Sequence, residues 1–188
     1  MPDTSWQEEV GNRVKTIQIV VGALIAGCVG FLAVAAVIVS GDAFEPDPEM
    51  AQVMNLVLVL FLVGDLIAWA IAPRMMVAQG RRKIADGAWT PPQGSGSGEM
   101  VKFIERTGDA GRLFALYMTR TIVACALLEG VAFFAIIVYL VTGSIVGLAI
   151  AVVLVIGLAL HMPTRGGVLH WIEDQLRLVE QDRQLRSM

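Results

Sequence analysis

The feature that most constrains the fold is a set of four long apolar runs, each close to the length that crosses a membrane as a helix. A spanning helix needs roughly 20 apolar residues, because it rises about 1.5 Å per residue through a hydrocarbon layer about 30 Å thick. The runs occupy residues 17–40, 51–72, 119–141 and 144–162. Hydrophobic residues make up 56% of the chain and charged residues only 16%, whereas soluble domains carry about 25% charged residues. This composition excludes a soluble globular enzyme and predicts four transmembrane helices.

The charges between the runs predict the orientation of the helices. The connection 41–50 contains acidic residues and no lysine or arginine. All 14 lysines and arginines of the chain lie in residues 1–16, 73–120 and 163–188. Because cytoplasmic loops are enriched in lysine and arginine, we expect both termini and the long loop 73–118 in the cytoplasm, with 41–50 on the opposite side.

The segments outside the runs are expected to contain helices and one flexible part. We expect a cytoplasmic helix in residues 1–16 and a flexible tether in the loop 73–118, where a Pro-Pro pair precedes the alternating Gly-Ser segment 94–98. The cytoplasmic tail 163–188 carries an apolar stripe at helical spacing, formed by Leu169, Ile172, Leu176 and Val179. The predicted fold class is therefore all-α: an integral membrane four-helix bundle followed by a C-terminal amphipathic helix.

Two acidic residues interrupt the apolar runs. Glu129 lies roughly 15 Å into the third run, and Asp65 lies roughly 10 Å before the cytoplasmic end of the second. An ionised side chain in hydrocarbon costs several kcal/mol, so an intramembrane acid is a candidate functional residue. Arg120 begins the third run at the expected cytoplasmic interface, where its long side chain can extend to the headgroups. These three residues are the candidate ion-binding residues.

Two interpretations of the acids remain open. In the functional one, Glu129 loads and releases a proton, since a desolvated carboxyl group favours its neutral form, and Asp65 and Arg120 assist it. In the structural one, Glu129 is protonated and hydrogen-bonded across a helix interface, while Asp65 pairs with Arg120 or with a backbone carbonyl. We prefer the structural interpretation at both acids.

The third run also carries a resemblance to a known family. Residues 120–138 begin with an arginine, place the segment Ala-Leu-Leu-Glu at mid-membrane and continue with aliphatic residues; they resemble the outer helix of rotary ATP synthase subunit c. The resemblance implies that Glu129 is an ion-carrying carboxylate. The chain as a whole is similar to small four-span membrane proteins of bacteria, which implies a multi-pass protein of the bacterial inner (plasma) membrane and no particular activity.

Small and polar residues within the runs predict how the helices pack. Gly22, Ala26 and Gly30 recur every four residues in the first run, and small residues at this spacing allow two helices to approach closely. We expect a packing seam inside the bundle, with a homodimer seam as the alternative. Asn55 in the second run is expected to donate a hydrogen bond to a neighbouring helix.

Motifs and net charge restrict the class of function. The sequence contains no Walker A loop, dinucleotide-binding glycine motif, Cys-X-X-Cys or metalloprotease helix motif, so we expect no enzyme, cofactor or metal site. The net charge of −3 argues against a nucleic-acid partner. The main expectation is a structural or accessory subunit of a membrane assembly, in contact with lipid and with a second copy or another membrane protein. The alternative is a proton- or cation-handling protein that uses Glu129.

Overall fold

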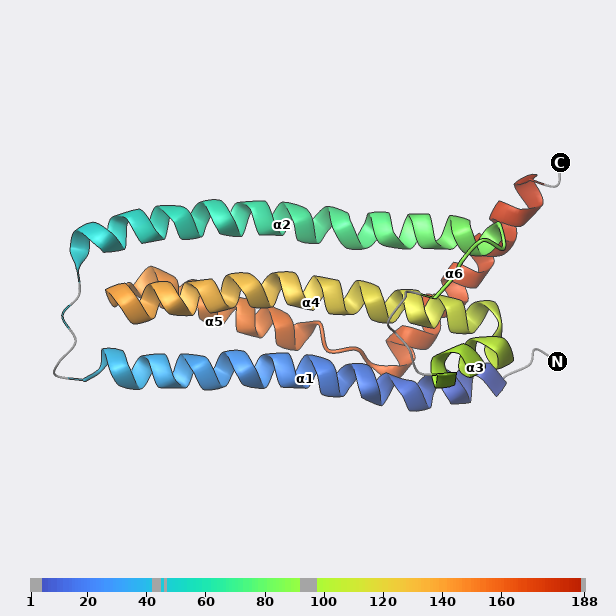
Figure 1. The fold of residues 1–188 in the computed structure, drawn as a ribbon, viewed down its shortest axis with the longest axis horizontal. Helices are drawn as coiled ribbons and strands as arrows, with labels where there is room; N and C mark the ends of the chain where they lie inside the picture. The colour runs from blue at the N-terminus through green and yellow to red at the C-terminus, as the bar shows by residue number, and fades with distance from the viewer. Residues whose placement is uncertain (1–4, 42–44, 46, 92–97, 187–188) are drawn as a thin grey trace. The chain divides into compact units, whose positions relative to one another are not determined.

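The computed structural model describes residues 5–41, 45, 47–91 and 98–186. All regular secondary structure in these residues is α-helical (Figure 1), which confirms the predicted all-α class. The helices in chain order are α1 (Ser5–Val39), α2 (Pro48–Ala85), α3 (Gly98–Thr107), α4 (Asp109–Thr142), α5 (Ile145–Leu160) and α6 (Arg165–Arg186).

Three of these helices are long and apolar enough to cross a membrane. They are α1, α2 and α4, and their most apolar stretches have mean hydropathies of 2.6, 2.4 and 2.5. The number is up to four if α5 and α6, which meet at a bend of 70°, are counted together as one span. Helix α5 has only 16 residues, about 24 Å at 1.5 Å per residue, so the fourth predicted run is shorter as a helix than its 144–162 boundaries suggested.

The helices extend beyond the predicted apolar runs. The expected N-terminal helix and the first run form a single helix, α1. Helix α2 continues beyond residue 72, so the segment 73–118 contains the end of α2, all of α3 and the start of α4. Pro73 lies inside α2; it removes one backbone hydrogen bond, but the Arg, Met, Ala and Gln residues after it favour helix. The predicted tether lies outside the described residues, except for Gly98, the first residue of α3.

The chain forms two compact units, to both of which α1, α2 and α4 contribute. The apolar unit consists of Ile19–Ala72 and Ile122–Met162. The polar unit consists of the described residues of Met1–Gln18, Pro73–Thr121 and Pro163–Met188. All 14 lysines and arginines of the chain fall within the bounds of the polar unit, so the two units differ in charge as well as in hydropathy.

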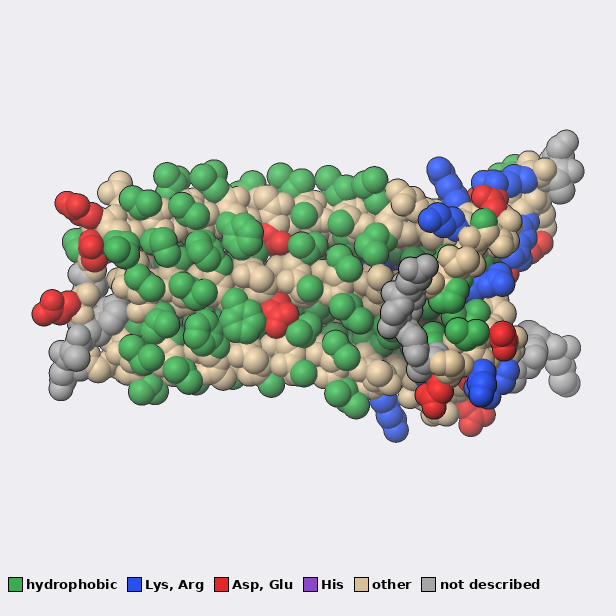
Figure 2. Space-filling model, in the orientation of Figure 1, with side chains coloured by type: hydrophobic (Ala, Val, Ile, Leu, Met, Phe, Trp, Pro, Cys, Tyr) green, Lys and Arg blue, Asp and Glu red, His purple; other side chains and the backbone are tan. Residues whose placement is uncertain are grey.

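Helix α4 is the central helix of the apolar unit. Its most apolar stretch is 44% buried, against 17% for those of α1 and α2. Gly143 forms the short turn into α5 with φ +65°. Glycine suits this position because the left-handed conformation strains residues that carry a Cβ. Gly147 then lies so close to α4 that a Cβ built on it would meet Ala135 O at 2.9 Å. The predicted tight hairpin is therefore present. Figure 2 shows hydrophobic side chains covering the visible face of this unit, with acidic side chains among them.

The polar unit is held by a small core and by ion pairs. Phe103 of α3 and Phe114 of α4 are buried against each other with ring centroids 5.6 Å apart. Helix α6 buries Val168, Ile172 and Val179, whereas Leu169 and Leu176 of the predicted stripe are only partly buried.

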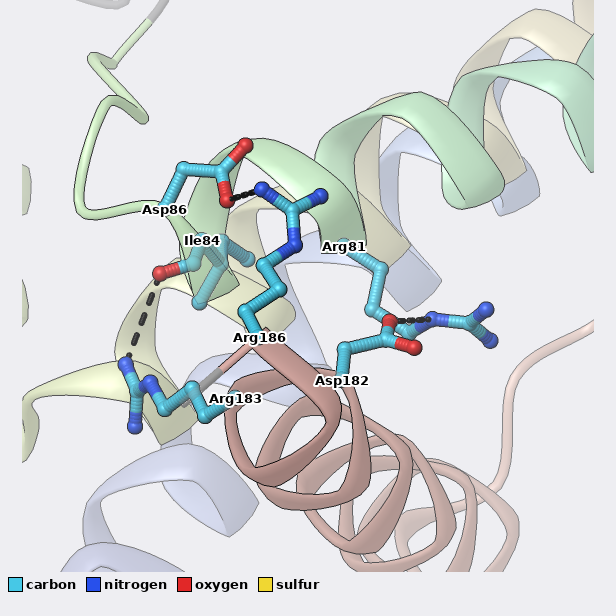
Figure 3. A network of polar contacts seen from close by, with 6 residues as sticks. All are labelled: Arg81, Ile84, Asp86, Asp182, Arg183 and Arg186. Atoms are coloured by element: carbon cyan, nitrogen blue, oxygen red, sulfur yellow. Dashed lines mark hydrogen bonds and ion pairs between the residues drawn. The ribbon is translucent and has the colours of Figure 1, made fainter. Parts of the chain in front are cut away.

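Arginine and aspartate side chains join the end of α6 to the end of α2 (Figure 3). Arg81 Nε lies 3.1 Å from Asp182 Oδ2. Arg186 pairs with Asp86. Both pairs lie on the outer part of the polar unit, where the side chains keep partial contact with solvent.

Candidate functional site

Asp65 lies on the buried face of α2 and is only 8% exposed. Its Oδ2 is buried without a hydrogen-bond partner among the described residues, so this atom makes neither of the pairings predicted for it. One helical turn later, the Nε1 of Trp69 is likewise buried and unpartnered. The ring of Trp69 contacts His161 edge-on, with centroids 5.3 Å apart. Two polar groups on one face of α2 thus lack partners, which is costly in an apolar environment.

Glu129 lies on α4 and is partly buried. It is within electrostatic reach of two fully buried cysteines, Cys125 one turn earlier on α4 and Cys28 on α1. Both thiols are free. A thiol is only a weak hydrogen-bond donor.

Helix contacts place the two acids at the same level of the apolar unit. Helix α2 runs parallel to α5, because Asn55 meets Ser144 near the start of both helices and Trp69 meets His161 near the end of this unit. It therefore runs antiparallel to α4, which the tight turn joins to α5.

The rings of Phe61 on α2 and Phe134 on α4 lie 5.5 Å apart and fix the register between these two helices. Asp65 lies four residues after Phe61, about 6 Å from this contact toward the C-terminal end of α2. Glu129 lies five residues before Phe134, and because α4 runs antiparallel to α2, it is displaced about 7.5 Å toward the same end. The two acids therefore lie within about 1.5 Å of each other along the helix axes, whereas the boundaries of the predicted runs placed Glu129 about 5 Å deeper than Asp65.

Arg120, the third candidate, belongs to the polar unit. Its guanidinium lies over the ring of Trp171 of α6, 5.7 Å from the centroid, a distance at which a cation is attracted to the face of an indole ring. It also lines a cavity with Arg74, Arg81 and Gln175. The sequence reasoning missed this grouping. The signal for part of it was present, since Arg74 and Arg81 are seven residues apart and share a helix face.

The small residues of α1 do not form the expected seam inside the bundle. A Cβ added to Gly22 or Gly30 would meet nothing within 4 Å, and Ala26 is exposed. The buried side of α1 in this unit is formed instead by Val21, Cys28 and Ala35. The alternative, a seam with a second helix from outside the chain, stays a prediction.

Asn55 does make a hydrogen bond between helices, as predicted, but with the opposite polarity. The hydroxyl of Ser144 donates to Asn55 Oδ1 at 2.9 Å. The described residues contain no group of three or more histidine, cysteine or acidic side chains placed to hold a metal ion.

Comparison of the chain with protein-family models, with curated proteins and with solved structures finds no match.

Proposed function

We propose that this chain is a four-span protein of the bacterial inner membrane, with both termini in the cytoplasm, and that it serves as an accessory or structural subunit of a membrane assembly. The membrane placement is supported by the division of charge: the lysines and arginines all fall in the polar unit, and the positive-inside rule assigns that unit to the cytoplasm. Reporter fusions at Asp47 and Gly96 test this topology, because they must report opposite sides of the membrane.

Helix α5 is the fourth span in this proposal. It is uncharged, it packs closely against α4 through Gly147, and it runs parallel to α2. A span shorter than the hydrocarbon layer is accommodated by local thinning of the bilayer at modest cost. His161 and Pro163 then lie at the cytoplasmic boundary, between the end of α5 and the start of α6.

The observation that carries the accessory role is the exposed small-residue face of α1. Gly22, Ala26 and Gly30 leave open space on the outside of the apolar unit. Transmembrane helices associate through such faces, since lipid offers no hydrophobic driving force and close backbone approach gains dispersion contacts. The face therefore suits a helix of another membrane subunit or of a second copy of this chain.

Photocrosslinking in native membranes tests the accessory role. A photoreactive residue at Ala26 is expected to give one defined protein adduct. The control position is Ile38, which is 50% exposed on the same helix but lies 12 residues on, about a third of a turn away around the axis. Adducts with lipid alone at both positions would contradict the proposal.

A matched substitution separates assembly from folding. Gly22→Leu should reduce the size of the detergent-solubilised assembly while leaving the stability of the chain unchanged, because a Cβ there meets nothing within 4 Å. Loss of folded protein in Gly22→Leu would show instead that this face packs inside the chain.

One observation favours a second function, the handling of protons or cations. Asp65 and Glu129 lie at the same level of the apolar unit, and Asp65 Oδ2 has no partner among the described residues. The resemblance of the third run to subunit c agrees with a carrier role for Glu129, and Asp65 supplies a second carboxyl group at the same level.

Proton flux into liposomes tests this second function. Glu129→Gln preserves the size of the side chain and much of its hydrogen bonding, so folded yield should be unchanged while flux is lost. Glu49→Gln, at the exposed start of α2, is the control and should retain flux. Wild-type protein without measurable flux would exclude the carrier role.

A further inference from the structure

A cavity in the polar unit brings together three arginines from two helices. It has a volume of about 240 Å³ and is lined by Arg74, Val77, Ala78, Arg81, Arg120 and Gln175. Arg74 and Ala78 are exposed, so the cavity is open to its surroundings on the α2 side. The lining, as far as the described residues show, contains three cations and no carboxylate.

Helix α6 contributes Gln175 to the lining of this cavity. Trp171, Gln175 and Asp182 are spaced by four and seven residues and so point to the same side of the helix. Trp171 supports the guanidinium of Arg120, and Asp182 accepts a hydrogen bond from Arg81 Nε. Figure 3 shows the terminal nitrogens of Arg81 directed away from Asp182. Each supporting contact therefore fixes an arginine while leaving hydrogen-bond donors for another group.

The charges and hydrogen bonds of this cavity are incomplete. Asp182 neutralises one of the three arginines, which leaves an excess positive charge. Gln175 Oε1 is buried and has no hydrogen-bond partner within the part of the chain that the structure describes, although a buried polar oxygen normally has one. A ligand that is an anion and also carries a hydroxyl donor would satisfy both requirements together.

We propose that this cavity binds the phosphate group of a phosphate ester, and that a hydroxyl of the same ligand donates to Gln175 Oε1. Arginine pairs with phosphate through two parallel hydrogen bonds, and Arg74, Arg81 and Arg120 present such donors from two sides. The ligand is either the headgroup of an anionic phospholipid or a soluble phosphate ester. Arg74 lies two residues beyond the end of the apolar unit in α2, and basic pockets near the ends of spanning helices bind lipid headgroups. The lipid source rests on the proposed membrane placement, whereas the phosphate chemistry does not.

Binding is measured on the full chain in detergent by native mass spectrometry and by thermal shift. The probes are dioleoylphosphatidylglycerol, dioleoylphosphatidylcholine, glycerol 3-phosphate and inorganic phosphate. Retention of one phosphatidylglycerol per chain, with no effect of the soluble anions, identifies a lipid site. Binding of glycerol 3-phosphate as well identifies a phosphate site open to soluble esters. Failure of both phosphatidylglycerol and glycerol 3-phosphate to bind above phosphatidylcholine overturns the proposal.

Substitutions separate a built site from general attraction to positive charge. Arg74→Gln and Arg120→Gln should each weaken binding about tenfold, as expected for the loss of a charge-assisted hydrogen bond. Arg82→Gln is the control, because Arg82 is exposed beside the cavity without lining it, and it should leave the affinity unchanged. An equal loss of affinity in Arg82→Gln would mean that binding depends only on the positive surface charge, and it would refute the site.

Gln175→Leu provides a readout that does not depend on arginine. Without ligand this variant should melt at the same temperature as the wild type or higher, because it removes an unpartnered buried oxygen. With ligand it should gain less stability than the wild type, because the hydroxyl contact is lost. A variant that responds to the ligand like the wild type would exclude Gln175 from the site.

Discussion

The α4–α5 hairpin gives the sharpest test of packing in the apolar unit, through Gly147→Ala. A methyl group on Gly147 would lie 2.9 Å from Ala135 O and 3.0 Å from Tyr139 N. Both neighbours are backbone atoms of a helix and cannot rotate away. The two helices must therefore separate by about 0.5 Å at this point, since ordinary contacts begin near 3.4 Å.

The separation extends along the same face of α5, because Ala151, Leu154 and Leu158 are buried on it at helical spacing after Gly147. Overpacking of this kind costs about 1–3 kcal/mol. A glycine-to-alanine change also gains up to about 1 kcal/mol of helix propensity. Gly157 lies on the same helix, and a Cβ added there meets nothing within 4 Å. Gly157→Ala therefore carries the propensity gain without the clash.

The quantity to measure is the difference between the two variants in free energy of unfolding. Unfolding in mixed micelles, followed by circular dichroism, should show Gly147→Ala less stable than Gly157→Ala by about 1–3 kcal/mol. Equal stabilities, or a more stable Gly147→Ala, would mean that α5 does not lie against α4 at this distance, and the hairpin packing described above would be wrong.

Three further predictions concern other contacts. Asp109→Asn should lower the free energy of unfolding of the polar unit, measured by chemical denaturation, by about 1–2 kcal/mol, because this carboxylate binds Arg183 at 2.7 Å and Arg112 at 3.0 Å. Asp174→Asn, which removes a more exposed pair, is the control and should change the free energy of unfolding by less than about 0.5 kcal/mol. Gly108→Ala should cost about 1–2 kcal/mol in the same assay, since its φ is +59°, whereas Gly166→Ala should be nearly neutral. Ser144→Ala should destabilise the apolar unit in micelles by about 0.6 kcal/mol, the typical value of a hydrogen bond between membrane helices.

Features that depend on composition along the chain were predictable from the sequence. The all-α class and three long apolar helices follow from uninterrupted apolar runs, and the turn after Thr142 follows from its glycine. The end of α2 was not predictable in the same way. The run of hydrophobic residues stops near residue 72, but the helix continues past Pro73 because the polar residues after it also favour helix and pack within the polar unit.

The candidate site was predictable only in its parts. The acids Asp65 and Glu129 are conspicuous in an apolar run, but their common level depends on the register between α2 and α4, which the contact of Phe61 with Phe134 sets. The face of α1 that packs inward was wrongly predicted, because small residues and Val21 compete for the interior and spacing alone does not decide between them. The arginine cavity could not be predicted, because it depends on the position of α6 beside α2 and α4, which the spacing of residues does not give.

The turn at Gly143 has a consequence for how the chain is made. Thr142 Oγ1 donates to Val138 O at 2.7 Å, and Ser144 N donates to Thr142 Oγ1 at 3.3 Å, so polar groups of the turn find partners within the nascent hairpin. A hairpin of this kind can enter a membrane as one unit, so the short α5 is expected to insert together with α4 rather than as an independent span.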